Sequence, residues 1–289
     1  PANAIEQLTV VTGGVPAKYG NATGGVVNII TKGPSRKLNG GAEVITSEFL
    51  DGYGYNLANF NATGPIWKKN KGEDNERTIA GFFIAGEFLR QRDRDPSRVG
   101  VSVLKDDVLE DIQNDPLTQA PVGDGFILRA ETLTDEDYEV RDVKPNAVRD
   151  NYRLSGKLDF RVSDNVNLTF GGSMDYTTYN RWINRFTLMN YDNNPLYREM
   201  SWRVFGRLTQ KFSRDLEEGE EKGLFQNAFY TLQFDYSKDY FTVESDRLCM
   251  NPFNYCYVGQ FDISRRPIYS YGEDDQSGNT AYLFQGFED

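Results

Sequence analysis

The sequence has no histidine, only two cysteines, and fewer positive than negative charges. Without histidine, Ser-His-Asp and Cys-His catalysis and the commonest zinc sites are excluded. The formal net charge of −11 disfavours a nucleic-acid partner, which would require a basic surface. It also disfavours a soluble protein that binds anionic lipid surfaces. No run approaches the roughly 20 apolar residues of a transmembrane helix. No phosphate loop, metal cluster or supported carboxylate pair stands out, so we predict a protein without enzymatic activity, cofactor or metal.

Aromatic residues are abundant in an otherwise polar chain. Apolar residues make up 38% of the sequence, yet it holds 17 tyrosines and 19 phenylalanines. Disordered chains are poor in aromatics. Aromatic and β-branched side chains fit the half-buried faces of strands. The composition therefore favours an all-β protein.

Alternation with a period of two residues is the dominant pattern. Between Tyr152 and Val162, apolar residues and glycine alternate with Arg153, Ser155, Lys157, Asp159 and Arg161. A Ser-Asp-Asn turn follows, and residues 165–176 repeat the alternation, which predicts a hairpin. Similar segments elsewhere give about seven expected strands: 38–49, 53–67, 78–91, 151–162, 165–176, 201–212 and 227–237.

The connections between these strands alternate between short and long. The long ones lie at about 91–150, 180–199 and 245–289. Strands of about ten or more residues joined by tight turns on one side and long loops on the other are typical of an outer-membrane up-and-down β-barrel. The alternative, a soluble β-sandwich, has strands of about 5–6 residues. Seven strands do not close such a barrel, because open edges in lipid leave backbone groups unpaired. Either the barrel is larger or the strand count is low.

The N-terminal residues carry the most specific pattern. Ile5-Glu6 precedes a short apolar run, and Tyr19-Gly20 precedes the segment GGVVNIITK at 24–32. This block of about 33 residues resembles the C-terminal end of the plug domain of TonB-dependent outer-membrane receptors. The matching positions have structural roles in the motif: Tyr19, Gly20, Gly24, Gly25, Asn28, Thr31 and Lys32.

Physical reasoning on the same block gives a compatible interpretation. The Gly24-Gly25 pair permits close backbone approach or a positive φ. The run 26–30 is nearly continuous in apolar residues, as in a strand covered on both faces. Pro34 ends it, because proline donates no hydrogen bond to a ladder. Taken alone, the block would also suit a buried hairpin of an α/β domain.

The resemblance implies a domain organisation and a function. Residues 1–33 would be the end of the plug, and 34–289 the N-terminal part of a transmembrane barrel of about 22 strands, with the three long connections as extracellular loops. The protein would import a nutrient, such as a metal chelate, oligosaccharide or peptide, across the outer membrane of a Gram-negative bacterium. TonB would act through a segment outside this chain, and the plug would gate the lumen.

Two other functions stay open. The barrel could be a structural subunit of a larger outer-membrane assembly, with its loops as interfaces for a surface lipoprotein or for a secretion or biogenesis complex. A soluble carbohydrate-binding β domain is the weaker alternative. For both the importer and the assembly subunit, we expect outer-membrane lipid and protein as partners and no nucleic acid.

Candidate functional residues follow from the strand pattern. We expect Arg153, Lys157, Asp159, Arg203 and Arg207 to face the lumen, where they would contact the plug or line the pathway. Trp202, near an expected strand end, suits an aromatic girdle at the membrane interface. In the loops, three aromatic residues are candidate ligand contacts: Tyr179, Trp182 and Tyr191.

Two loop features allow further hypotheses. Cys249 and Cys256 lie seven residues apart in a turn-rich stretch. This spacing favours a local disulfide and an oxidising compartment over two free thiols. The acidic stretch 106–115 has oxygen ligands that calcium accepts. Its spacing does not fit an EF-hand, and a solvated outer loop is the preferred interpretation.

Overall fold

The computed structural model describes residues 1–14, 24–70, 72, 76–122, 125–212, 228–245, 266–273, 278 and 280–288. The chain divides into two compact units. Unit 1 contains residues 1–94, 147–180 and 196–243, and unit 2 contains residues 95–146, 181–195 and 244–289. Within the described residues, no helix has both the length and the apolar character needed to cross a membrane.

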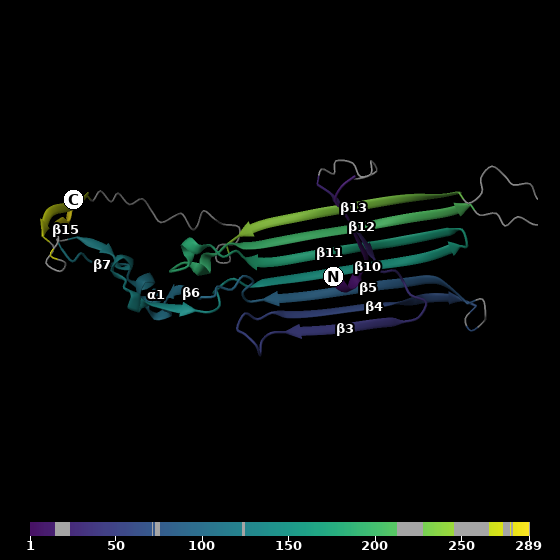
Figure 1. Ribbon diagram of the computed structural model, residues 1–289, viewed down its shortest axis with the longest axis horizontal. Coiled ribbons are helices and arrows are strands. Elements are labelled where there is room, and N and C mark those ends of the chain that lie inside the picture. Colours follow the sequence, from purple (N-terminus) through teal and green to yellow (C-terminus); the bar gives the residue numbers. More distant parts are fainter. Residues whose placement is uncertain are drawn as a thin grey trace, which may run out of the picture. The chain divides into compact units, whose positions relative to one another are not determined.

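A seven-stranded sheet forms most of unit 1, in the spatial order β13-β12-β11-β10-β5-β4-β3 (Figure 1). Each strand lies beside its neighbour in sequence once the insertion between β5 and β10 is set aside, so the topology is up-and-down. From β3 to β12, adjacent strands pair antiparallel. The strands are β3 (Asn39–Thr46), β4 (Asn56–Lys69), β5 (Arg77–Gln91), β10 (Arg149–Ser163), β11 (Val166–Asn180), β12 (Leu196–Phe212) and β13 (Ala228–Glu244).

The expected strands correspond to these seven one for one. The turn between β10 and β11 pairs Ser163 with Val166. The two largest differences are at β12, which begins at Leu196 and not near residue 201, and at β13, which ends at Glu244 and not near residue 237. Trp202 therefore lies well inside a strand and packs on Tyr236 at 5.4 Å between ring centroids. Its expected position at a strand end was therefore wrong, and its place in an interfacial girdle stays a prediction.

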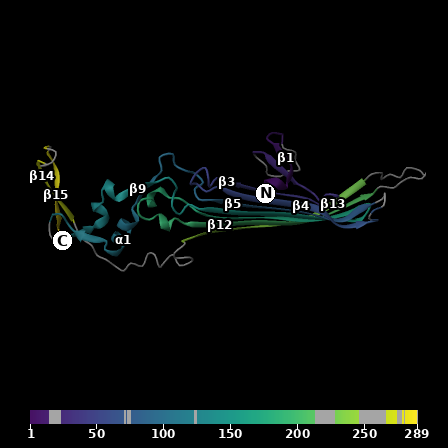
Figure 2. The same cartoon turned by 90° about the horizontal axis from the view of Figure 1, so that it is seen from below.

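A small hairpin precedes the sheet. It follows the 3-10 helix η1 (Ala2–Ala4) and consists of β1 (Ile5–Val11) and β2 (Val26–Thr31), paired antiparallel from Ile5–Thr31 to Val11–Val26. Figure 2 shows β1 standing off one face of the seven-stranded sheet. The residues on either side of the hairpin, η1 and the linker after β2, make the contacts with that sheet.

Unit 2 contains short elements that period-two alternation did not reveal. They are β6 (Val101–Leu104), α1 (Asp106–Asn114), β7 (Leu117–Gln119), β8 (Phe126–Leu128), η2 (Arg129–Thr132), η3 (Asp135–Asp137), β9 (Tyr138–Arg141), η4 (Asn184–Phe186), η5 (Tyr191–Asn193), β14 (Arg266–Glu273) and β15 (Thr280–Glu288). They pair locally as β6–β9, β7–β8 and β14–β15. The connection between β5 and β10 thus folds back on itself, where the sequence suggested only a solvated loop.

Candidate functional site: the polar face of the sheet and the hairpin docked on it

The two faces of the sheet differ in chemistry. On one face, apolar side chains of adjacent strands lie in register, as in Leu154–Met174–Trp202. Many of them are exposed, with Leu232 at 67% and Phe234 at 70%. An exposed apolar surface of this extent needs an apolar neighbour. In a barrel strand, the lipid-facing side chains alternate with lumen-facing ones in this way.

The opposite face carries charged side chains that pair across strands. Arg153 on β10 donates to Glu87 on β5 (Nη1–Oε1, 2.7 Å) and to Asp175 on β11 (Nε–Oδ2, 2.8 Å). Arg203 on β12 donates through two nitrogens to Asp235 on β13 at 2.5 and 2.6 Å. Glu87 and Asp175 lie directly across from Arg153 in the strand register. The two groups of ion pairs therefore join β5, β10 and β11, and β12 and β13.

The residues expected to face the lumen are brought together on this polar face. Arg153, Lys157 and Asp159 alternate along β10, and Arg203 and Arg207 alternate along β12. Asp159 accepts a hydrogen bond from Thr169 at 2.6 Å, and Arg207 donates to Gln233 at 2.9 Å. Their placement toward a lumen stays a prediction, because it depends on how the barrel is completed.

The N-terminal segment docks on the polar face at η1. Ala4 (1% exposed) packs with Phe83 (2%) and Ala85 (0%) of β5 in a small buried core. Asn3 donates from Nδ2 to the side-chain oxygen of Asn59 (3.2 Å) and to a neighbouring backbone carbonyl on β4. The apolar contact fixes the position of η1, and the amide hydrogen bonds fix its orientation.

A second attachment lies at the end of β2. The ammonium group of Lys157 donates to the carbonyl oxygen of Thr31 at 2.8 Å. Beyond it, the hydroxyl of Thr63 accepts from the amide of Ser35 at 2.9 Å. Pro34 approaches β5 so closely that a Cβ on Gly81 would lie 2.5 Å from the proline Cβ. Glycine is needed at this position because the linker crosses directly over the strand.

The N-terminal motif residues are only partly described. Asn28 pairs with Thr9 in the hairpin, and Thr31 pairs with Ile5. Gly25 has a φ of 149°, and a Cβ there would lie 2.8 Å from the carbonyl oxygen of Val11. Only glycine tolerates this approach. Gly24 and Lys32 flank β2. Tyr19 and Gly20, and the candidate disulfide of Cys249 and Cys256, lie outside the described residues.

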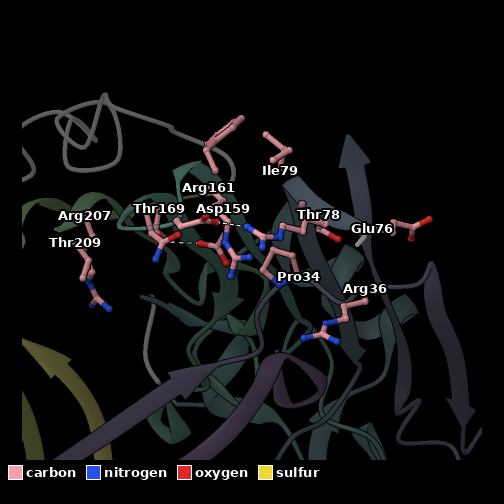
Figure 3. Close-up of a pocket in the computed structure, with 15 residues that line it drawn as sticks. Pro34, Arg36, Glu76, Thr78, Ile79, Asp159, Arg161, Thr169, Arg207 and Thr209 are labelled. Atoms are coloured by element: carbon pink, nitrogen blue, oxygen red, sulfur yellow. Dashed lines mark hydrogen bonds and ion pairs between the residues drawn. The ribbon is translucent and has the colours of Figure 1, made fainter. Parts of the chain in front are cut away.

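A cavity of about 830 Å³ lies between the linker and the polar face (Figure 3). Four arginines line it: Arg36 of the linker, Arg77 of β5, Arg161 of β10 and Arg207 of β12. Of the four, only Arg207 is among the residues expected from the sequence to face the lumen. Arg161 shares the alternation of Lys157 and Asp159, so strand periodicity could have found it. The contribution of Arg36 depends on the path of the linker, for which the sequence carries no signal.

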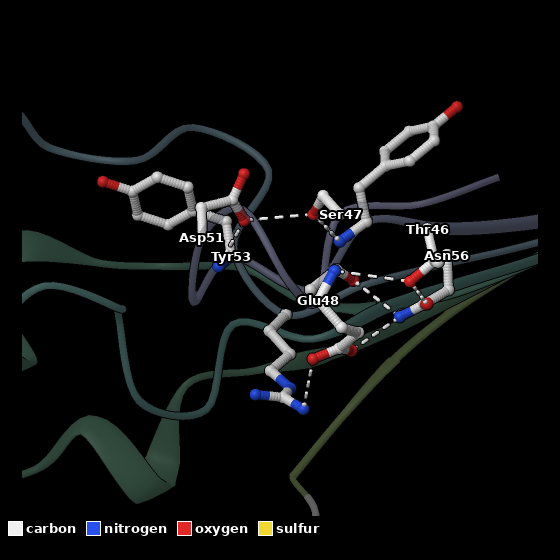
Figure 4. A network of polar contacts seen from close by, with 9 residues as sticks. Thr46, Ser47, Glu48, Asp51, Tyr53 and Asn56 are labelled. Carbon is white, nitrogen blue, oxygen red and sulfur yellow. Dashed lines mark hydrogen bonds and ion pairs between the residues drawn. The ribbon is translucent and has the colours of Figure 1, made fainter.

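At the other end of the sheet, the β3–β4 turn is tied to the end of β5 (Figure 4). Asp51 accepts from the Ser47 hydroxyl (3.0 Å) and from the Tyr53 amide (2.9 Å). Glu48 accepts from Asn56 (2.8 Å) and from Arg92 (3.0 Å). Arg92 is the first residue after β5, so this network holds the point where the long connection leaves the sheet.

In unit 2, the two loop segments 95–146 and 181–195 pack together. The amide of Leu104 donates to the carbonyl oxygen of Leu188 at 2.9 Å, and Leu104 is fully buried. Arg141 pairs with Asp106 (2.9 Å), and the Tyr191 hydroxyl also donates to Asp106 (3.3 Å). Hydrogen bonding to Arg141 holds the pKa of Asp106 below its usual range, and burial raises the pKa of Tyr191.

The three aromatic residues proposed as ligand contacts have different environments. Tyr191 is 7% exposed, which gives it a packing role between the loop segments. Trp182 is half-buried and donates to Asn184 at 3.0 Å. Tyr179, at the end of β11, stacks on Tyr197 with 5.0 Å between centroids and donates to Glu199. Among the described residues, no group of three or more Cys, Asp or Glu side chains is placed to hold a metal ion.

The chain matches no family-level sequence profile. It is 44% identical over 71 residues to the "Probable TonB-dependent siderophore receptor PirA" of Acinetobacter baumannii. It is 41% identical over 69 residues to the "Ferric enterobactin receptor PirA" of Pseudomonas aeruginosa. These stretches cover 24% and 23% of this chain and only 9% of each relative.

Solved structures give a weaker likeness. The siderophore receptor PirA from A. baumannii aligns with 81% of this chain and 31% of its own, at 19% identity and a TM-score of 0.39. A mutant of the ferric enterobactin receptor PfeA from P. aeruginosa aligns with 85% of this chain and 34% of its own, at 17% identity and a TM-score of 0.36.

The all-β prediction is confirmed by the up-and-down sheet, which has one apolar face and a hairpin docked on its polar face. This arrangement is the one expected of part of an outer-membrane β-barrel with a plug segment. The resemblance to TonB-dependent outer-membrane receptors is confirmed by the sequence relatives. The outer membrane of a Gram-negative bacterium is the location expected from this resemblance. The names of these relatives describe receptors and no enzyme.

Proposed function

We propose that this chain forms the plug–barrel junction of a receptor that imports a ferric siderophore. The two sequence relatives are named for siderophores, which narrows the nutrient classes that the sequence alone left open. In this proposal the loops capture the chelate, the plug closes the lumen, and TonB acts on the plug to open a path.

One observation carries the proposal. The two ends of the β1–β2 hairpin attach to the polar face of the sheet, through the Ala4–Phe83–Ala85 core just before β1 and the Lys157–Thr31 hydrogen bond at the end of β2. A hairpin held against the charged face of a barrel wall is the arrangement expected of a plug. A soluble β domain would bury apolar faces against each other and would not expose one of them.

The proposed orientation follows from the connections. The turn between β10 and β11 is two residues long, and residues 92–148 leave from the other end of the sheet. Bacterial outer-membrane barrels have short periplasmic turns and longer outer loops. We therefore assign residues 1–33 to the plug, residues 34–289 to the barrel, and the connections near 92–148 and 181–195 to the outside.

The direct test is energy-dependent iron uptake in the native strain. We expect deletion of the gene to abolish uptake of ⁵⁵Fe from at least one siderophore, with ferric enterobactin tested first. We expect loss of TonB or of the proton gradient to abolish the same uptake without reducing binding at the surface. A deletion strain that takes up every tested ferric siderophore at the wild-type rate would contradict the proposal. Surface binding without uptake in wild-type cells would favour the assembly-subunit alternative.

A further inference from the structure

The cavity beneath the linker lies at the short-turn end of the sheet. Its wall includes Asp164 in the turn after β10, Arg77 at the start of β5 and Thr209 near the end of β12. These strand ends are remote from the ends that lead to residues 92–148 and 181–195. Under the orientation proposed above, the cavity opens toward the periplasm.

Two of the three carboxylates in the cavity wall are paired with cations. Glu76 pairs with Lys68, and Asp164 pairs with Arg77. Asp159 accepts a hydrogen bond from the Thr169 hydroxyl. That hydroxyl carries no charge, so Asp159 keeps one negative charge in the wall.

Three guanidinium groups are left without a carboxylate partner in the described part of the chain. Arg36 and Arg161 are exposed and make no ion pair there, and Arg207 donates to the neutral amide oxygen of Gln233 at 2.9 Å. These three residues come from three separate elements and line one cavity. Guanidinium groups present planar sets of donors that suit anionic oxygen pairs.

We propose that Arg36, Arg161 and Arg207 form an exit subsite for an anionic metal chelate. This inference rests on the proposed function. It adds that the imported chelate is anionic and that it contacts a second binding site during import. The volume of about 830 Å³ falls within the roughly 300–1,000 Å³ of small-molecule sites. Since these three cations outnumber the one uncompensated carboxylate, Asp159, the wall has a net positive charge and suits a chelate with exposed anionic oxygens better than a neutral chelate.

The experiment replaces the charged side chains with neutral polar ones in the intact receptor. The test variant carries Arg161→Gln and Arg207→Gln, and a companion carries Arg161→Lys and Arg207→Lys. The matched control is Lys211→Gln, which removes a cation from the end of β12 outside the cavity wall. Surface binding and energised uptake of ferric enterobactin, an anionic catecholate complex, are measured in the same cells.

We expect the double glutamine variant to bind ferric enterobactin at the surface like wild type and to take it up at least about tenfold more slowly, as loss of charge-assisted hydrogen bonds implies. The double lysine variant should retain most uptake, and the control all of it. Wild-type uptake in the double glutamine variant would overturn the subsite. Equal loss of surface binding and uptake would also overturn it, since the arginines would then be structural. If wild-type cells take up no ferric siderophore, the proposed function itself fails.

Discussion

Lys157 and Thr31 lie 126 positions apart in the sequence, yet the lysine ammonium donates to the threonine carbonyl oxygen at 2.8 Å. This hydrogen bond joins the middle of β10 to the last residue of β2. It lies between the buried core at η1 and the linker that crosses β5. The hairpin is therefore attached on both sides, and each attachment can be weakened separately by substitution.

The first prediction concerns Lys157. Lys157→Met removes the donor, so the Thr31 carbonyl oxygen loses this hydrogen bond. We expect docking of the N-terminal segment on the sheet to weaken by about 1 to 2 kcal/mol. We expect increased passage of large antibiotics through the outer membrane and a higher open-channel frequency in planar bilayers. Lys211→Met, at the exposed end of β12, is the control. Equal permeability of the two variants would show that the hydrogen bond does not hold the segment in place.

The second prediction concerns the crossing of the linker over β5. Gly81→Ala places a Cβ 2.5 Å from the Pro34 Cβ, so the linker or the strand has to move. Overpacking of this kind costs about 1–3 kcal/mol. Gly41→Ala is the matched control, because its Cβ would meet only the Asn61 amide at 3.8 Å. Thermal unfolding of the detergent-solubilised receptor measures both, and a lower melting temperature is expected for Gly81→Ala alone.

The third prediction concerns the arginine between two carboxylates. Arg153→Met leaves Glu87, whose side chain is 8% exposed, and Asp175 without their shared cation. Because Arg153 and Asp175 keep contact with water, we expect the free energy of unfolding to fall by about 1 to 3 kcal/mol. Breaking a fully buried ion pair costs more, roughly 3–5 kcal/mol.

Two further variants test whether charge is the cause. Adding Glu87→Gln to Arg153→Met should restore part of the lost stability, because the buried uncompensated charge is then removed. Arg90→Met breaks the more exposed contact with Asp150, at 3.8 Å, and should change stability by less than about 0.5 kcal/mol. Equal effects of Arg153→Met and Arg90→Met on thermal unfolding would contradict this account.

The strands could be predicted from the sequence because one face is apolar and the other polar along most of their length. The start of β12 was missed since Arg198 shares a face with Trp202 and interrupts the alternation. The elements between β5 and β10 were missed for another reason. Strands such as β6, with four residues, are too short to show a period. Docking of η1 depends on contacts between distant residues, for which one sequence holds no local signal.

The fourth prediction concerns pH and the loop contact of Asp106 with Arg141. Hydrogen bonding to Arg141 lowers the pKa of Asp106. The contact therefore stabilises the loops fully above the ordinary aspartate pKa of about 3.9. That contribution is lost as the pH falls through the lowered pKa of Asp106 in the folded protein. We expect protease protection of residues 95–146 to decrease below about pH 4, and Arg141→Gln to abolish this dependence. Tyr191→Phe, which removes only the weaker 3.3 Å contact, should preserve it.

The last prediction concerns the long connection between β5 and β10. Gln91 and Arg149 are direct register partners, so the strand ends that flank the connection are already adjacent. Replacing residues 92–148 with a two-residue Asn-Gly turn should therefore keep the pairing of β5 with β10, because such turns match the twist of antiparallel strands. If these residues form an outer recognition loop, the shortened receptor will reach the outer membrane in heat-modifiable form and will not bind ferric siderophore at the cell surface. Failure to insert would show that the segment belongs to the barrel wall, and unchanged binding would place recognition on other loops.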